Sequence, residues 1–357
     1  MAQNDPKKMS GRQKTMKRDA YVVFTILSLA LLVGALMVAG CIGPTQENKG
    51  SSDKVWHVGV LSGMSFFADT EDGFRQKMAE LGYVEGKNIV YDSRKMTGYD
   101  QAAYQAALKD FRDNKVDLVL VFPTEASQEA KAAMKGTGIP VVFANVFTED
   151  TGLIESVRQP GGDITGVRWG GPDLGLQRYE VMRELVPGAT RMLVPYLRDY
   201  PTTKSQLVAV RSAASADGIT LVEIPVDNAT EIEQELGRLA PSVSGKDTVI
   251  LAIAEPLFVT PDSFKVITEF AQSHGIPAGG AYMSLDGHES VFGLTPRSVP
   301  QGRQAAILAD KIFRGMPAGE IPVVTAENYF QLNYRQVQQL GLPVSEGLLS
   351  RADEIIR

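Results

Sequence analysis

The sequence predicts an α/β protein made of two doubly wound parallel-sheet lobes, joined by a hinge and enclosing a central ligand cleft. Three observations predict it. From Val55 onward, short apolar runs alternate with helical patterns, as in doubly wound folds. Some of these runs are apolar throughout, as expected of parallel strands covered on both faces. The same alternation then starts again about 130–137 positions later, where "HGIPAGG" repeats the position of "TGIPVVF".

The first copy begins with a strand at 56–62, followed by a helix over 72–82. That helix has Phe74, Met78 and Leu81 at i, i+4 and i+7, and it ends at Gly82. The run "VDLVLVF" is the most continuous apolar strand. The expected strands of this copy are 56–62, 87–93, 116–122 and 139–145, and the expected helices are 72–82, 99–114 and 125–138.

The second copy repeats the order strand, helix, strand. Its expected strands are 190–197, 219–226, 247–254 and 276–282, and its expected helices are 203–218, 229–243 and 261–275. Segments 290–315 and 323–342 each supply a further strand and helix, and we expect them to cross back between the lobes. The predicted first lobe is therefore 55–167 with 288–320, and the second is 168–287 with 321–357.

The N-terminal 54 residues differ from the rest in composition. Residues 1–20 carry a net charge of +4, and Tyr21–Gly40 are uncharged and mostly apolar, which is the pattern of a secretory leader. The polar segment 42–54 is typical of a flexible tether. We therefore expect a leader over 1–40 and a tether over 41–54. The 20 apolar residues are also long enough to span a bilayer, at ~1.5 Å per residue.

Cys41, the only cysteine, follows the apolar run directly. A disulfide within the chain is excluded, since there is no second cysteine. "VAGC" at 38–41 resembles the lipobox of secreted lipoproteins, which implies lipidation of Cys41 and attachment to the outer face of the cell membrane. The alternatives are an uncleaved membrane helix and a chance cysteine. All three place the remaining residues outside the cytoplasm.

Charge and composition exclude several function classes. The whole chain carries −6, so the part from Cys41 onward carries −10, which disfavours nucleic acid as a partner. The three histidines show no ligand-like spacing, so no metal site is expected. "GGPDLG" at 170–175 lacks the dinucleotide-binding spacing and follows no clear strand. No cofactor and no catalytic residues are predicted.

Residues from Val55 to the end resemble the type I periplasmic-binding-fold substrate-binding proteins of ABC importers, in the subgroup that includes binders of aromatic amino acids. The matching runs are "GFRQKMAELGYVEGKNIVYDSR", "IPVVFANVFTEDTGLIESVRQPGGDITGV", "LGLQRYEVMRELVPGATRM" and "QLNYRQVQQLGLPVSEGLLSRADEII". The most specific parts are "LGYVEGKN" at 81–88 and "PGGDITGV" at 160–167. The resemblance implies a monomeric receptor outside the cytoplasm that delivers a small solute to a membrane permease.

Side chains after the strands of the first lobe are candidate ligand contacts, because ligands bind outside the carboxyl ends of parallel strands. Hydroxyl groups there donate hydrogen bonds, and aromatic rings stack on apolar ligands. The same groups also serve as helix caps, lobe-closing contacts or hinge packing. Thr124 and Ser127 lie at an expected helix start, where free backbone N–H groups and hydroxyls favour a ligand carboxylate. Glu125 departs from the small residues that the family has at its position, which argues against a simple transfer of a carboxylate site unless its side chain turns away. The candidates are Ser62, Ser65, Phe66, Phe67, Thr124, Glu125, Ser127, Asn145, Phe147 and Trp169.

The second lobe contributes Tyr196, Asp199, Glu255 and Tyr282 after its strands. Glu255 either pairs with an ammonium group of the ligand or is a solvated carboxylate at a helix start. Arg168 and Arg297, near the crossovers, are alternative partners for a ligand carboxylate or are solvated hinge charges.

The leading functional hypothesis is thus a lipid-anchored solute receptor of an ABC importer that closes two lobes over a small amino-acid-like, polar or aromatic molecule. A ligand-sensing receptor working with a separate signalling partner is the alternative. An extracellular enzyme is disfavoured because three histidines offer little acid–base chemistry.

Overall fold

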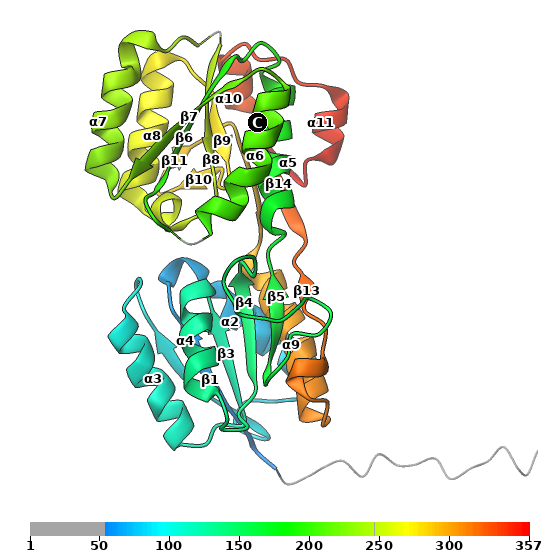
Figure 1. The fold of residues 1–357 in the computed structure, drawn as a ribbon. Helices are drawn as coiled ribbons and strands as arrows, with labels where there is room; N and C mark the ends of the chain where they lie inside the picture. The colour runs from blue at the N-terminus through cyan, green and yellow to red at the C-terminus, as the bar shows by residue number, and fades with distance from the viewer. Residues whose placement is uncertain (1–53, 201, 246) are drawn as a thin grey trace, which may run out of the picture. The chain divides into compact units, whose positions relative to one another are not determined.

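The computed structural model describes residues 54–200, 202–245 and 247–357. Within these residues the strands form a six-stranded sheet, in the order β13-β5-β4-β3-β1-β2, and a seven-stranded sheet, in the order β15-β14-β12-β9-β8-β6-β7 (Figure 1). Each sheet carries helices, and in each sheet the strand order reverses at one point. The prediction of two doubly wound sheets is therefore confirmed. The expected leader, the tether up to residue 53 and Cys41 lie outside the described residues.

The six-stranded sheet is covered on both faces. Alternate residues of β3 enter different apolar clusters: Leu118 and Leu120 join the cluster that contains α2, and Val119 and Val121 join the cluster under α3 and α4. The strands are β1 (Trp56–Ser62), β2 (Ile89–Lys95), β3 (Leu118–Phe122), β4 (Val141–Val146), β5 (Ile164–Arg168) and β13 (Val324–Thr325). The helices are η1 (Ser65–Phe67), α2 (Asp69–Glu80), α3 (Gln101–Asp113), α4 (Thr124–Met134), α9 (Ser298–Phe313) and η4 (Ala318–Glu320).

The seven-stranded sheet repeats this plan, with α5 packed on α6 and α7 on α8. Its pairing is parallel except between β12 and β14. The strands are β6 (Arg191–Leu197), β7 (Thr220–Val226), β8 (Thr248–Ala252), β9 (Ala278–Gly280), β12 (Phe292–Pro296), β14 (Asn328–Asn333) and β15 (Glu354–Ile356). The other elements are α5 (Gly171–Leu185), α6 (Thr203–Ala216), α7 (Ala229–Leu239), η2 (Ala240–Ser242), η3 (Pro256–Val259), α8 (Pro261–His274), β10 (Ser284–Leu285), β11 (His288–Glu289), α10 (Tyr334–Gln339) and α11 (Glu346–Arg351).

Three segments connect the two sheets. The chain passes from β5 to α5, from β12 to α9 and from β13 to β14. Sheet membership differs from the expected division of the chain at two points. β12 pairs with β14 in the seven-stranded sheet although 288–320 was expected in the first lobe, and β13 pairs with β5 although 321–357 was expected in the second. Hydrogen bonding between strands distant in sequence decides both.

The segment between the two copies also contains elements that the sequence pattern did not predict. β5 is only five residues long and contains Thr165 and Gly166, so it lacks the apolar run by which the other strands were recognised. Contrary to expectation, "GGPDLG" therefore does follow a strand, and it begins the helix α5.

Strand order locates one crevice in each sheet. From β1 the chain moves outward to β2 and then returns past β1 to β3, so the connections leave β1 and β3 in opposite directions. β6 and β8 have the same relation in the second sheet. At such a switch point the loops after the two strands diverge and leave room for a ligand.

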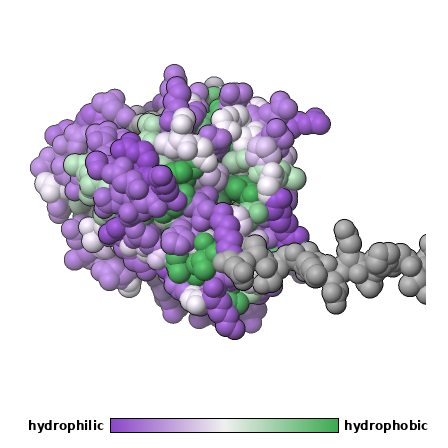
Figure 2. All heavy atoms as spheres, turned by 90° about the horizontal axis from the view of Figure 1, so that it is seen from below, coloured by the Kyte–Doolittle hydropathy of each residue, from purple (hydrophilic) through white to green (hydrophobic). Residues whose placement is uncertain are grey.

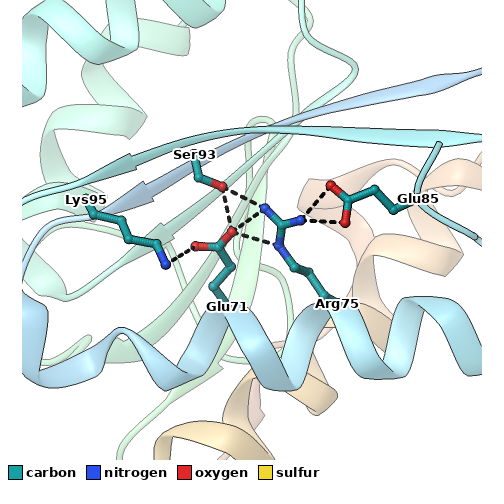
Figure 3. A network of polar contacts seen from close by, with 5 residues as sticks. All are labelled: Glu71, Arg75, Glu85, Ser93 and Lys95. Carbon is teal, nitrogen blue, oxygen red and sulfur yellow. Dashed lines mark hydrogen bonds and ion pairs between the residues drawn. The ribbon is translucent and has the colours of Figure 1, made fainter.

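A network of charged side chains holds α2 against β2 (Figure 3). Glu71 is 2% exposed and accepts hydrogen bonds from Arg75 and Ser93, while Lys95 lies 3.6 Å from its second oxygen. Arg75 in turn binds both carboxylate oxygens of Glu85 at 2.8 Å. The buried carboxylate is thereby compensated, and the N-terminal end of α2 is held where it meets β4.

Large exposed apolar side chains are scattered over the described surface. Figure 2 shows one face on which hydrophilic residues predominate and apolar ones form small areas. Over the whole described structure, the large apolar side chains that are exposed are Val55, Phe66, Val84, Tyr99, Val157, Val208, Ile307 and Met316. In the part of the chain that the structure describes, no helix has the length and apolar character needed to cross a bilayer.

Candidate functional site

A cavity lies where the strand ends of the two sheets converge. Loops after β1, β3, β4 and β5 line it from the six-stranded sheet, and loops after β6, β8 and β9 line it from the seven-stranded sheet. Both switch points therefore contribute. The lining residues are Met64, Phe67, Pro123, Thr124, Asn145, Phe147, Trp169, Tyr200, Ala254, Glu255, Pro256, Val259 and Tyr282.

The cavity volume is about 30 Å³. This volume is far below the ~300–1,000 Å³ of typical small-molecule sites. Side chains of the two lobes also meet beside the cavity, where Tyr200 bonds Glu125 and Phe66 packs on Tyr282. The lobes are thus closed on each other in this structure, and a solute enters only if the hinge segments let them separate.

Aromatic rings form one wall of the cavity. The Trp169 ring lies edge-to-face with Phe147, at a centroid distance of 5.0 Å, and with Phe67 at 6.1 Å. Across the cleft, Tyr282 meets Phe66 edge-to-face at 5.0 Å. These residues come from four different loops, so the wall forms only when both lobes are in place.

A hydrogen-bond network fixes Trp169 and Asn145. The indole Nε1 of Trp169 donates to Oε1 of Gln301 at 3.1 Å, and the Gln301 amide donates to Oδ1 of Asn145. The Asn145 amide donates to Thr70 at 2.6 Å. Asn145 is therefore engaged on both side-chain atoms and orients the aromatic wall. Gln301 escaped the sequence prediction because it lies inside α9, far from any strand end.

The start of α4 is organised by internal hydrogen bonds. The hydroxyl of Thr124 accepts from the backbone N–H of Phe147 at 3.1 Å, and the hydroxyl of Ser127 donates to the carbonyl of Pro123 at 2.7 Å. Thr124 lines the cavity, whereas the buried Ser127 is outside the lining. Glu125 points to the other lobe, as described below.

Glu255 is a buried carboxylate of the seven-stranded lobe that lines the cavity. Its side chain is 5% exposed, and Oε2 accepts from the backbone N–H of Leu197 at 3.1 Å. Oε1 is buried and has no hydrogen-bond partner among the described residues. Burial raises the pKa of Glu255 to about 8, because removal from water penalises the charged form.

Two contacts join the lobes at the cavity. The Tyr200 hydroxyl donates to Oε1 of Glu125 at 2.6 Å, and Phe66 packs on Tyr282 as described. Burial, followed by the nearby Glu125 carboxylate, raises the pKa of Tyr200 well above its ordinary value, so its hydroxyl keeps its proton. Tyr200 was not among the predicted residues, although it directly follows the predicted Asp199; its position after the end of β6 is the signal that could have found it.

Several predicted residues lie beside the cavity without lining it. The Ser65 hydroxyl donates to the carbonyl of Thr97 at 3.3 Å, and the Tyr196 hydroxyl donates to Glu223 at 3.1 Å. Phe66 reaches the cleft only through its contact with Tyr282. The residues outside the lining are Ser62, Ser65, Phe66, Glu125, Ser127, Tyr196 and Asp199.

The two hinge arginines have partners away from the cavity. Arg168 pairs with Glu149 and donates to the Thr325 hydroxyl at 3.2 Å, which ties the first and third connecting segments together. The guanidinium of Arg297 lies over the Tyr329 ring at 4.5 Å. Neither is among the lining residues.

Arg178 of α5 is a buried cation that sequence reasoning did not single out. It is fully buried, donates to the Leu294 carbonyl at 2.8 Å and to Gln206 at 3.4 Å, and leaves Nη2 without a partner among the described residues. Burial lowers its pKa to about 10. Its charge acts on Tyr282, but it does not reach the cavity.

A second cavity, of about 620 Å³, lies between α8, the β10–β11 hairpin and α10. Two of its charged lining residues, Glu289 and Arg335, pair with each other at 2.7 Å, and a third, Glu269, lies 3.9 Å from Lys265. It contains none of the predicted site residues and receives side chains from one lobe only. In the described part of the chain, no group of three or more potential metal ligands is present.

Comparison with solved structures shows the type I periplasmic-binding fold. A conserved domain protein from Vibrio cholerae matches with a TM-score of 0.73 at 23% identity, over 85% of this chain and all of its own. A protein from Streptococcus pneumonia, solved in complex with L-Trp, matches with a TM-score of 0.72 at 21% identity over the same shares. A solute-binding protein from Bacillus halodurans, with bound myo-inositol, matches with a TM-score of 0.60 at 11% identity, over 82% of this chain and 99% of its own.

A search of curated proteins returned no match. The family model described as "ABC transporter substrate binding protein" matches residues 58–356, which is nearly all of the described structure. The expected resemblance is therefore confirmed at the level of the family. This chain belongs to the ABC transporter substrate-binding protein family.

Proposed function

We propose that this chain captures a small amino-acid-like, polar or aromatic solute between its two lobes, outside the cytoplasm, and delivers it to the permease of an ABC importer. The observation that carries the proposal is the convergence of both switch points on one cavity, which is lined by aromatic rings and a buried carboxylate. Binding closes the lobes, and the permease recognises the closed form. The structure from Streptococcus pneumonia, which holds L-Trp, supports an aromatic solute.

The ligand contacts in this proposal are the predicted residues that line the cavity. They divide into an aromatic wall and polar groups at strand ends. The wall is Phe67, Phe147, Trp169 and Tyr282, and the polar groups are Thr124, Asn145 and Glu255. The protein acts as a monomer, without cofactor or catalytic step.

Thermal unfolding of the full-length chain in mild detergent tests this function. Amino acids, amines, nucleosides and sugars are added singly, and a true ligand raises the midpoint because it binds only the folded state; at 100 times Kd the gain is ~2.7 kcal/mol. The proposal fails if no compound shifts the midpoint while a hydrolase substrate is turned over.

We further propose that a lipid on Cys41 holds the receptor at the membrane. One acyl chain binds a bilayer only marginally, so a stable anchor needs two chains or a retained helix. Cys41→Ser is expected to release the protein into the soluble fraction. Retention of the variant in the membrane with an intact leader would instead support a helix at Tyr21–Gly40.

A further inference from the structure

The cavity between the lobes contains a buried carboxyl group, and no cationic side chain of the described lining faces it. Glu255 lines the cavity with its buried Oε1 unpartnered among the described residues. None of the described lining residues is a lysine, arginine or histidine. A buried carboxylate without a cationic partner is costly, so the site favours a ligand that brings positive charge.

A second carboxylate approaches from the other lobe. Glu125 of α4 has its Oε1 bound to the Tyr200 hydroxyl, and its buried Oε2 has no partner within the described chain. Tyr200 bonds Glu125 and lines the cavity together with Glu255. Each lobe thus presents one acid around the same tyrosine, and a cation placed there is attracted to both lobes at once.

The aromatic wall also favours a positively charged ligand group. A cation is attracted to the faces of indole, phenol and phenyl rings within ~6 Å of their centroids. Trp169 has its N–H occupied by Gln301, so the ring offers the ligand only its π-surface. Because the Trp169 donor is occupied, the wall offers few partners for the hydroxyl groups that a polyol would remove from water.

A ligand carboxylate, by contrast, finds no basic partner in the described lining. Arg168 pairs with Glu149, Arg297 lies over Tyr329, and Arg178 is enclosed in the seven-stranded lobe. Resting on the proposed solute-binding function, we propose that the ligand is an organic amine that lacks a carboxylate, with its ammonium group placed between Glu255 and the aromatic wall.

Proton linkage provides a signature of this arrangement. Tyr200 and Tyr282 line the cavity with Glu255; Tyr200 bonds Glu125, and the charge of Arg178 acts on Tyr282. Because the pKa of Glu255 is about 8 in the protein as it stands, the acid is mostly protonated at pH 7. A bound ammonium stabilises the carboxylate and expels that proton, so the affinity rises with pH up to about 8.

The test is calorimetric titration of the full-length chain in detergent with matched probes. Tryptamine, L-tryptophan and tryptophol share one ring system and differ in charge; phenethylamine, L-phenylalanine and putrescine extend the set. We expect an amine to bind at least tenfold more tightly than the corresponding amino acid or alcohol. At pH 7 its binding should release close to one proton, read from titrations in buffers of different ionisation enthalpy.

Glu255→Gln keeps the side-chain size and is expected to lose at least tenfold of the preference for the amine, together with the proton release. Glu223→Gln, which changes a carboxylate of β7 outside the cavity, serves as the matched control and should retain both. An amino acid, alcohol or sugar that binds more tightly than every amine overturns this inference and leaves the solute-binding function intact. Absence of binding by every class overturns both.

Discussion

The hydroxyl of Tyr200 donates a 2.6 Å hydrogen bond to Oε1 of Glu125, and this bond links the loop after β6 to the first turn of α4. The two residues belong to different lobes, so the bond exists only when the lobes are closed. Oε2 of Glu125 is buried without a partner among the described residues, which makes Tyr200 the group that compensates this carboxylate.

Tyr200→Phe is therefore expected to shift the protein toward an open form. Leaving a buried carboxylate unpaired costs ~1–3 kcal/mol or more, and the lobes can avoid that cost by separating. Small-angle scattering of the ligand-free protein should show a larger radius of gyration. Tyr196→Phe is the control, since that hydroxyl bonds Glu223 on the neighbouring strand of the same lobe. Superimposable profiles for Tyr200→Phe and the unchanged protein would contradict the expectation.

The buried carboxylate of Glu255 predicts a stability that falls as pH rises. Its pKa is raised from 4.5 to about 8, so between these values the unfolded state ionises while the folded state keeps its proton. Above pH 8 the full penalty is present, on the order of 5 kcal/mol. Glu255→Gln should unfold at higher urea concentration than the unchanged protein at pH 9 and at similar concentration at pH 4. A difference that is constant across this range would show that ionisation of Glu255 is not its cause.

Ligand binding should be reported by one of the two tryptophans. Trp169 lines the cavity, whereas Trp56 of β1 stacks on Phe313 at a centroid distance of 3.9 Å and lies outside the lining. With a ligand identified by thermal shift, the emission of Trp56→Phe should change on titration, because only Trp169 remains. The emission of Trp169→Phe should stay constant. The reverse result would place the site elsewhere.

The network around Glu71 predicts that substitution of two of its glutamates lowers the free energy of unfolding by different amounts. Glu71→Gln removes a buried charge that faces Arg75 and Lys95, so we expect a loss of ~2–3 kcal/mol in the free energy of unfolding. Glu85→Gln changes the exposed partner of the same arginine and should cost less than ~1 kcal/mol. Urea denaturation measures both. Equal losses in the free energy of unfolding would contradict a larger contribution from the buried Glu71.

Sequence reasoning placed the elements of both copies to within a few residues because those elements repeat clear apolar patterns. The strand at 56–62 and the helix starts at 203, 229 and 261 coincide with β1, α6, α7 and α8. The predictions that failed have two physical causes. β5 has too few apolar residues to be recognised, and the sheet membership of β12 and β13 depends on backbone pairing with strands distant in sequence.

For the site, strand ends were a sufficient guide to Phe67, Thr124, Phe147, Trp169, Glu255 and Tyr282, all of which line the cavity. Strand ends did not show, however, whether a side chain points into the cavity or away from it. Ser127 lies in α4 just after β3 and Tyr196 lies near the end of β6, but their hydroxyl groups bond Pro123 and Glu223. Gln301, which orients Trp169 and Asn145, lies in a helix 132 positions after the indole that it binds.

The sequence by itself determined the α/β class, the two copies and the family, since these depend on local periodicity and on runs of matching residues. Tertiary structure alone decided that Glu125 meets Tyr200 across the lobes and that Glu255 retains an unpaired oxygen beside aromatic rings. Those relationships arise from side chains that converge from separate loops. The net charge of the cavity is the sum of the charges on all these side chains, so it cannot be read from any single stretch of the sequence.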